Sequence, residues 1–264
     1  MENNQYTVPG YVTEIFSSRQ GEGLYVGEEQ IFLRLAGCAC RCIYCDTAES
    51  LTTEGHSKLT VEETLAKVRS VRGENGPNSV SVTGGEPLAQ VEFLLELLPA
   101  LRQDGFRIHL ETNGAMPAAL RKVVEFCDVV AMDIKLPSAA GRAFWKEHAE
   151  FLAAAGGKAF VKIVLTSEST MEEWQRAVNL LASANPAPPL IIQPATPIEY
   201  LADRLGGGPG ANNEAAAATA GPREGKRLVS PPSQERLAAF YDGARQLLKD
   251  VRISPQMHPV WGVR

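Results

Sequence analysis

The chain has 264 residues, of which 44% are hydrophobic and 22% charged, and its formal charge is -5. This composition is ordinary for a globular protein, and the length suits one large α/β domain or two small ones. The acidic balance gives no basic surface for nucleic acid, and no apolar run predicts a membrane span. The polar start, Met1 to Tyr6, lacks a signal-peptide core, so we expect a cytoplasmic protein.

Strand-like and helix-like segments alternate along most of the chain. Seven segments are expected to be strands: 29–35, 78–83, 106–111, 129–134, 159–165, 190–193 and 251–253. The helices expected between them begin at Thr60 and then cover 88–102, 117–126, 141–155, 170–184 and 233–249. Thr60 with Glu63, and Thr170 with Glu173, have the spacing of a capping box. This alternation predicts a parallel sheet with helical crossovers.

Seven strands are one fewer than a closed eight-fold barrel contains. We therefore expect an α/β fold of the partial, open parallel β/α barrel type, in a single domain over 1–264; a doubly wound open sheet is the alternative. The Gly- and Ala-rich stretch 203–227 has no apolar periodicity. It is interpreted as a flexible surface insertion, with a role as a lid as the alternative.

Four of the five cysteines follow the first expected strand within one loop. Cys38, Cys42 and Cys45 have the spacing C-x3-C-x2-C. A cubane iron–sulfur cluster normally takes four thiolates, so three leave one iron open to a small molecule. A zinc site that uses Cys40 is the alternative, but the paired C-x2-C knuckles of zinc folds differ from this loop. We expect Cys40 to pack beneath the loop and Cys127 to lie in the core.

Polar residues recur at the carboxyl ends of the expected strands, the edge at which parallel barrels and sheets form their sites. One strand ends in Thr83-Gly84-Gly85-Glu86-Pro87, where the glycines let the backbone approach a ligand. Later strands end in Glu111 to Gly114, in Asp133 to Ser138 and in Gln193 to Thr196. Taken one at a time, these segments have simpler explanations. Asn113-Gly114 could be only a turn, and Asp133 and Lys135 could pair only with each other. Together they line one rim.

These motifs resemble those of the radical S-adenosylmethionine (SAM) enzymes. The resemblance implies a [4Fe-4S] cluster bound by Cys38, Cys42 and Cys45. It also implies that the Gly-Gly-Glu-Pro segment holds the amino group of the SAM methionine. The implied SAM-binding residues lie at the strand ends: Gly85, Glu86, Glu111, Asn113, Lys135, Pro137, Ser138, Gln193 and Thr196.

Segments near the two ends of the chain make this resemblance more specific, because they point to one family among the radical SAM enzymes. The segment Gln20-Gly21-Glu22-Gly23 precedes the cysteine loop, and Pro255-Gln256-Met257-His258 lies near the end of the chain. From Glu14 to Gly262, apart from the insertion, the chain resembles the 7-carboxy-7-deazaguanine synthase family. The resemblance implies a radical SAM carbon–nitrogen lyase of queuosine and deazapurine biosynthesis. Such an enzyme converts 6-carboxy-5,6,7,8-tetrahydropterin to 7-carboxy-7-deazaguanine with loss of ammonia.

The same resemblance implies pterin contacts from Gln20, Gly21, Glu22, Arg34, Thr83 and His258. The Arg34 guanidinium suits a bidentate grip on the substrate carboxylate, and a salt bridge to an acid at the barrel bottom is the alternative. Thr47 is implied to bind Mg2+ together with substrate oxygens, because Mg2+ keeps waters and takes oxygens from substrates. The alternative for Thr47 is a turn capped by Asp46.

The family also implies partners. SAM is regenerated in each cycle, a flavodoxin-type protein donates the electron, and two copies form a homodimer. Two other functions remain open. An activating enzyme for glycyl radicals would share the cysteine loop but would not need Gln20–Gly23 or Pro255–His258, and a zinc-binding protein without catalytic activity would use only the cysteines.

Overall fold

The computed structural model describes residues 8–201 and 226–263. Its main sheet has nine strands in the order β11-β8-β7-β6-β5-β4-β2-β1-β3. Neighbouring strands from β11 to β2 pair in parallel, whereas β1 pairs antiparallel with both β2 and β3. The parallel strands are β2 (Glu29–Leu35), β4 (Ser79–Gly84), β5 (Arg107–Thr112), β6 (Val129–Asp133), β7 (Ala159–Leu165), β8 (Leu190–Pro194) and β11 (Val251–Ile253).

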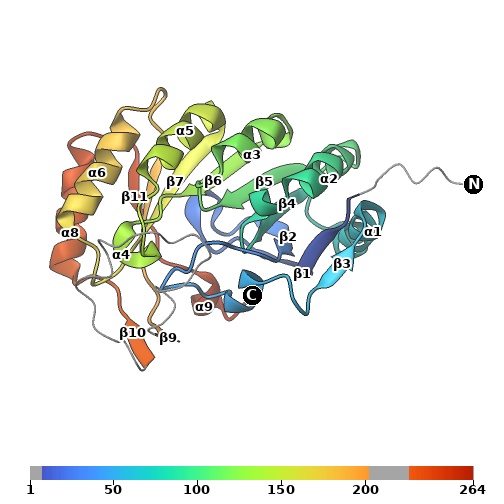
Figure 1. The fold of residues 1–264 in the computed structure, drawn as a ribbon, viewed down its shortest axis with the longest axis horizontal. Coiled ribbons are helices and arrows are strands. Elements are labelled where there is room, and N and C mark those ends of the chain that lie inside the picture. Colours follow the sequence, from blue (N-terminus) through green and yellow to red (C-terminus); the bar gives the residue numbers. More distant parts are fainter. Residues whose placement is uncertain (1–7, 202–225, 264) are drawn as a thin grey trace, which may run out of the picture.

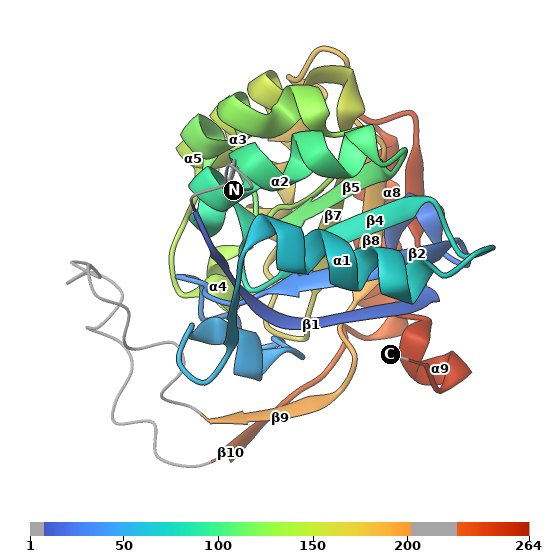
Figure 2. The same cartoon turned by 90° about the vertical axis from the view of Figure 1, so that its right-hand side faces the viewer.

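The main helices connect successive parallel strands and cover the outer face of the curved sheet (Figure 1). They are α1 (Val61–Arg72), α2 (Val91–Gln103), α3 (Pro117–Val123), α5 (Trp145–Ala155), α6 (Met171–Ala182) and α8 (Gln234–Arg245). Figure 2 shows α1, α2, α3 and α5 side by side on this face, with β1 running next to α1. Within the described residues, the main helices lie on one face of a sheet that does not close, which makes a partial barrel and confirms the predicted fold class over the doubly wound alternative.

Each parallel strand sends alternate side chains to the two faces of the sheet. On β4, Val80 and Val82 join the core beneath the helices, while Ser81 and Thr83 line the inner face. The same alternation along β5 to β8 puts aliphatic residues on the outer face, while the inner face mixes polar residues with apolar ones such as Ala131, Phe160 and Val164. Most positions on both faces are buried, as expected for a parallel sheet covered by helices.

All seven predicted strands are present, and both capping boxes form, at Thr60 and at Thr170. The helix predicted from residue 141 instead begins at Trp145, because the left-handed Gly141 (φ +73°) ends a short helix α4 (Pro137–Ala140). The helix predicted from 88 starts as a 3-10 turn, η3 (Pro87–Gln90). The final predicted helix ends at Arg245 rather than at 249.

Four strands were not predicted: β1 (Gly10–Arg19), β3 (Ser57–Leu59) and the hairpin of β9 (Ile198–Leu201) and β10 (Lys226–Val229). Most of the predicted insertion, 203–225, lies outside the described residues, but its last two residues, 226 and 227, begin β10. In the part of the chain that the structure describes, no helix is long and apolar enough to cross a bilayer.

Candidate active site

A cavity of about 560 Å3 opens at the carboxyl ends of the parallel strands, a size suited to a small-molecule site. It is lined by most of the residues that the sequence analysis selected: Gln20, Glu22, Arg34, Cys38, Cys42, Cys45, Thr47, Thr83, Gly85, Glu111, Asn113, Lys135, Gln193, Thr196 and His258. The other four selected residues, Gly21, Glu86, Pro137 and Ser138, lie behind this lining. Pro137 begins α4, and the Ser138 backbone N–H donates to Glu173.

The cysteine loop forms one side of the cavity, and backbone hydrogen bonds hold it in place. Gly37 N–H donates to the Ser50 carbonyl (2.8 Å), and Cys38 N–H donates to the Leu51 carbonyl (3.1 Å). Cys38, Cys42 and Cys45 all face the cavity. Among the described residues, no three His, Cys, Asp or Glu side chains are placed to hold a single metal ion.

Cys40 is buried, as predicted, but it also lines the cavity beside the other three cysteines of the loop. Its sulfur accepts a hydrogen bond from Asn113 Nδ2 (3.4 Å) and packs near Phe144. The hydrogen bond between Cys40 and Cys38 lowers the pKa of the Cys38 thiol to about 6, against the opposing effect of burial. Burial raises the pKa of Cys42 to about 11. Since thiolates are the metal-binding form, Cys38 is the thiol most readily ionised for ligation.

The segment Gly84-Gly85-Glu86 packs directly against the start of the cysteine loop. Gly85 N–H donates to the Leu35 carbonyl and Glu86 N–H to the Gly37 carbonyl, both at 2.8 Å. A Cβ on Gly85 would lie 2.5 Å from the carbonyl oxygens of Gly37 and Ser50. Gly84 has φ +126°, where side chains are strained. Only glycine fits these contacts between two motifs that are far apart in the sequence.

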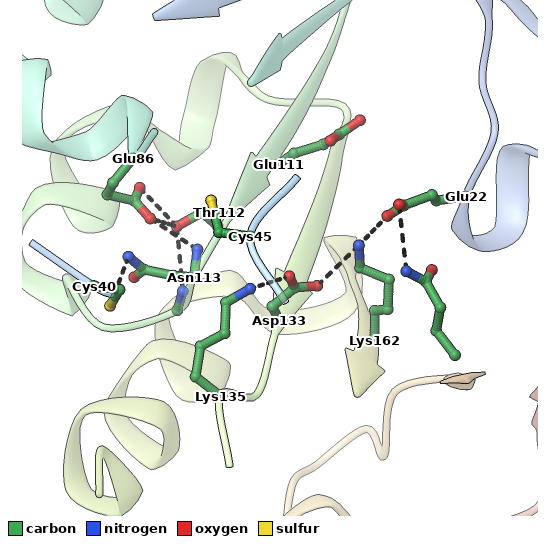
Figure 3. A network of polar contacts seen from close by, with 12 residues as sticks. Glu22, Cys40, Cys45, Glu86, Glu111, Thr112, Asn113, Asp133, Lys135 and Lys162 are labelled. Atoms are coloured by element: carbon green, nitrogen blue, oxygen red, sulfur yellow. Dashed lines mark hydrogen bonds and ion pairs between the residues drawn. The ribbon is translucent and has the colours of Figure 1, made fainter. Parts of the chain in front are cut away.

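Glu86 is buried beneath the cavity wall and is bound only by neutral donors. Its carboxylate accepts hydrogen bonds from the hydroxyl of Thr112 (2.9 Å) and the N–H of Asn113 (2.8 Å) (Figure 3). It also accepts one from the N–H of Leu88 (3.0 Å). Burial outweighs these donors and raises the pKa of Glu86 to about 7. A ligand ammonium group would offset that burial cost.

Glu111, which the resemblance assigned to SAM, lies among residues assigned to the substrate. Its carboxylate accepts hydrogen bonds from Gln20 Nε2 (2.7 Å), the Ser81 hydroxyl (2.7 Å) and the Thr83 hydroxyl (3.0 Å). These donors come from the loop after β1 and from the inner face of β4. The contacts place Glu111 beside Gln20 and Thr83 on the inner face of the barrel.

Four buried charges of alternating sign run along the inner face from Lys135 to Glu22 (Figure 3). Lys135 Nζ lies 2.6 Å from Asp133 Oδ2, and Asp133 Oδ1 lies 3.5 Å from Lys162 Nζ. Lys162 also donates to Glu22 Oε2. Burial disfavours a charge on Glu22, but the attraction of Lys162 and its hydrogen bond prevail and lower the pKa of Glu22 to about 2.

The segment after β11 crosses the mouth of the cavity. Gln256 Nε2 donates to Glu22 Oε1 (2.6 Å) and to Asp46 Oδ2 (3.0 Å), and Thr196 donates to Gln256 Oε1. Met257 N–H donates to the Gly21 carbonyl (2.9 Å). Gly21 therefore supports the segment that carries His258 rather than lining the cavity itself, and a Cβ on Gly21 would lie 2.8 Å from His258 Nδ1.

Arg34 is paired within the cavity. Its Nε lies 2.9 Å from Glu14 Oε1, and its guanidinium stacks over Phe16 at 5.8 Å. Glu14 faces Arg34 across the β1–β2 ladder, so the acid belongs to the neighbouring strand and also lines the cavity. The salt bridge that the sequence analysis considered thus exists, but not to an acid at the barrel bottom.

Thr47 also faces the cavity, at the start of a 3-10 turn, η2 (Ala48–Leu51). Its hydroxyl makes no capping hydrogen bond to that turn and lies 3.9 Å from Cys45 Sγ. The hydroxyl oxygen is therefore available at the cavity surface.

Three buried polar atoms at the cavity lack a hydrogen-bond partner within the described residues: the Tyr44 hydroxyl, His109 Nε2 and Gln193 Oε1. Buried polar atoms are usually satisfied, so these atoms indicate that a polar ligand completes the site. Such a ligand agrees with the three facing thiols and with the Gly85 contacts, and the residues present fit both a cluster and SAM.

Sequence analysis missed several cavity residues, above all Glu14, His109, Lys162 and Gln256. Lys162 carried a usable signal, because it is the charged residue in the apolar run Ala159–Leu165. Gln256 lay in a recognised motif but was not selected. Glu14 and His109 have no local signal, since only the strand pairing brings them to the cavity.

Comparison with known proteins identifies the family. The model of the Radical SAM superfamily matches residues 33–185. A 7-carboxy-7-deazaguanine synthase from Geobacter sulfurreducens is 35% identical over 270 residues, covering 94% of this chain and 96% of that protein. The enzyme of that name from Thermococcus kodakarensis is 35% identical over 225 residues, covering 74% of this chain and 87% of its own.

Solved structures agree on the fold. QueE from Escherichia coli superposes with a TM-score of 0.52 at 21% identity, covering 70% of this chain and 84% of that one. A radical SAM methyltransferase from Sphaerobacter thermophilus gives 0.59 at 14% identity, covering 91% and 77%. With a shared fold, a matching superfamily model and relatives aligned over nearly their full length, the chain belongs to the 7-carboxy-7-deazaguanine synthase family of radical SAM enzymes.

Proposed function

We propose that the protein converts 6-carboxy-5,6,7,8-tetrahydropterin to 7-carboxy-7-deazaguanine and ammonia. The observation that carries this proposal is the cavity itself, in which three thiols face one side and the amide and carboxylate groups of Gln20, Glu22 and Glu111 face the other. The atoms balance without an external oxidant, because the substrate loses only the elements of ammonia. A hydrogen atom taken from the substrate can thus be returned within one cycle.

Membership of the radical SAM superfamily implies a [4Fe-4S] cluster and SAM. Cys38, Cys42 and Cys45 would hold the cluster. When bound, the cluster and SAM together would supply a 5′-deoxyadenosyl radical to the cavity. Gly85 and Glu86 would receive the methionine ammonium, because the burial cost of ionised Glu86 is offset by a cation.

Lys135, Asn113 and Thr196 would supply further polar contacts to SAM. Ser138 and Pro137 would act from behind the lining by shaping the start of α4. Gln193 donates a hydrogen bond to Glu22 (3.3 Å). Gln193 would therefore lie between the part of the cavity proposed to bind SAM, the SAM end, and the part proposed to bind the pterin, the pterin end.

The pterin end would recognise both edges of the substrate. Glu22 and Glu111 would accept hydrogen bonds from its N–H groups. Gln20 and Thr83 donate to the Glu111 carboxylate, and Gln20 Oε1 also accepts from the backbone N–H of Glu22. Arg34 and His258 would bind the carboxylate, with Arg34 exchanging part of its contact with Glu14. Thr47 would give its hydroxyl to Mg2+, whose other ligands would be substrate oxygens and water.

An anaerobic assay tests this function. Reconstituted protein is mixed with dithionite, SAM, Mg2+ and 6-carboxytetrahydropterin, and the products are identified by mass spectrometry. Formation of 7-carboxy-7-deazaguanine with little net consumption of SAM would support the proposal. Release of 5′-deoxyadenosine without deazaguanine would contradict the proposal that the pterin is the substrate. It would favour an activating enzyme that acts on a protein glycine.

The remaining family expectations belong to the same proposal. We propose one radical SAM domain over the chain, a flavodoxin-type electron donor and a homodimer. Replacing dithionite with reduced flavodoxin in the assay tests the donor, and light scattering of the purified protein tests the dimer.

A further inference from the structure

Lys162 is a charged residue at the centre of a buried strand. On β7 its neighbours Val161 and Ile163 are fully buried in the core beneath the helices. Lys162 points to the opposite face, and its side chain is 15% exposed within the cavity. A buried ammonium group is costly unless it is paired, so this position calls for a reason beyond packing.

The ammonium group of Lys162 joins two carboxylates from different parts of the chain. It donates to Glu22 Oε2, from the loop after β1, and lies 3.5 Å from Asp133 Oδ1 on β6. Glu22 Oε1 accepts from Gln256 (2.6 Å) and Gln193 (3.3 Å). Lys162 is the one donor to Oε2 among the hydrogen bonds of the described residues, and a carboxylate oxygen can accept two. One acceptor position on Glu22 Oε2 is therefore open at the cavity.

We propose that Lys162 is a positioning residue that orients the Glu22 carboxylate so that its open acceptor position receives an N–H group of the aminopyrimidinone edge of the pterin. This inference rests on the proposed function and adds to it a residue that discriminates the substrate. A ligand that lacks an N–H donor at this edge would leave the charged Glu22 oxygen without its partner, which is a strong basis for rejection.

The surrounding charges make the role of Lys162 testable by pH. Besides each other, Glu22 and Lys162 face Asp133 and Lys135 at the end of β6, His109 on β5, and His258 in the segment after β11. Asp46 reaches Glu22 through Gln256. With Lys162 present, the pKa of Glu22 is about 2, so Glu22 stays ionised at every working pH. Without Lys162, burial would raise this pKa, and Glu22 would gain a proton as the pH falls.

The experiment measures binding rather than turnover. Reconstituted protein with SAM and without reductant is titrated anaerobically with 6-carboxytetrahydropterin by calorimetry, between about pH 6 and pH 8.5. The quantity compared is the ratio of the variant Kd to the wild-type Kd, which cancels the titration of the substrate. For Lys162→Met we expect this ratio to rise about tenfold for each pH unit below the new pKa of Glu22. For Lys162→Arg, which keeps the charge, we expect a ratio that does not change with pH.

Two further variants test whether the effect on binding arises from the contact between Lys162 and Glu22. In a Glu22→Gln background, Lys162→Met should change Kd by about twofold or less, because no carboxylate remains to be oriented. Lys158→Met is the matched control, since Lys158 lies just before the same strand and binds only backbone carbonyls. Its Kd ratio should be close to one at each pH.

The inference is overturned if the Kd ratio for Lys162→Met does not change with pH. It is also overturned if Lys162→Met weakens binding as much in the Glu22→Gln background as in the protein that keeps Glu22. Loss of pterin binding in Lys162→Arg despite a normal iron content would also overturn it. Failure of the proposed function is a separate outcome, because in that case the wild-type protein itself does not bind the pterin.

Discussion

Two buried glutamates near this cavity are shifted in opposite directions. Burial raises the pKa of Glu86 to about 7, since its partners are neutral N–H and O–H groups. Burial acts on Glu22 in the same sense, but the ammonium of Lys162 and the amide of Gln256 bring the pKa to about 2. These opposite shifts agree with the ligands that we propose for the two side chains: a cation at Glu86, and the N–H groups of a neutral ring at Glu22.

The raised pKa of Glu86 predicts a pH-dependent affinity for SAM. The ligand ammonium favours the carboxylate form, so SAM binding lowers this pKa. Affinity should therefore level off above pH 7 and fall by about tenfold per unit as the pH drops below 7. Calorimetric titration of the reconstituted protein with SAM, from about pH 5.5 to 7.5, measures this dependence. Glu86→Gln is the control, and it should bind SAM weakly with an affinity that does not change with pH. If its affinity still falls with pH as in the wild type, Glu86 is not the group that binds the ammonium.

The four cysteines of the loop should differ in their effect on the cluster. Cys42→Ala should lose the cluster and all reductive cleavage of SAM, because it removes one of three thiolates. Cys40→Ala is the matched control, since Cys40 stands outside the C-x3-C-x2-C spacing and its sulfur is held by Asn113 and packs near Phe144. It should keep iron near the wild-type level. Iron analysis and the brown absorbance of anaerobic protein measure both variants, and a cluster that persists in Cys42→Ala would contradict the assignment.

At the scale of elements, the site depends on contact between two loops that follow neighbouring strands. β2 leads into the cysteine loop and β4 leads into Gly84-Gly85-Glu86, and the two strands pair in parallel. The loops leave the same edge of the sheet and exchange backbone hydrogen bonds. Cluster and SAM would consequently be held by one backbone unit, whose spacing is set by the sheet.

Gly85→Ala tests this contact. The added Cβ would lie 2.5 Å from two backbone carbonyl oxygens, which cannot move without displacing the cysteine loop. We expect the variant to fold but to lose most of its iron or to bind SAM about a hundredfold more weakly, as a loop shift would disturb several contacts. Gly157→Ala, with nothing within 4 Å of its Cβ, is the control and should keep both properties. Normal iron and SAM affinity in Gly85→Ala would show that the loops adapt.

At the scale of the whole molecule, the cavity is assembled from residues that span nearly the entire described chain, from Thr13 to His258. The inner faces of the barrel strands form its floor, and the cysteine loop forms one wall. The segment after β11 returns to the loop after β1, where Met257 and Gln256 bind Gly21 and Glu22. The pterin end is therefore complete only when both ends of the described chain have docked.

Removal of residues 254–264 tests this dependence. The cluster loop is held by Ser50 and Leu51, so the truncated protein should keep its iron and still form 5′-deoxyadenosine. It should form no deazaguanine, because Glu22 loses Gln256 and the cavity loses His258. Mass spectrometry of both products measures this separation. Val260→Ala, at an exposed position of the same segment, should retain turnover; deazaguanine formation by the truncated protein would contradict the proposal.

The sequence by itself determined the seven parallel strands, the cysteine loop and the family. Runs such as Ala159–Leu165 are apolar except for one residue, Lys162, and this pattern is local, as are the capping boxes at Thr60 and Thr170. The spacing of Cys38, Cys42 and Cys45 is likewise readable without a fold. β1 escaped prediction because its residues are mostly half-buried, without a continuous apolar run.

The tertiary structure alone decided which polar groups meet. Glu22 and Lys162 are 140 residues apart, and Glu22 and Gln256 are 234 apart. Their contacts depend on the curvature and register of the sheet and on the docking of the last segment. Charge matters in the same way, because the opposite pKa shifts of Glu86 and Glu22 follow from the partners that the fold brings to each. A sequence pattern reports the preference of a residue, whereas the free energy of a buried charge depends on neighbours that only the folded chain supplies.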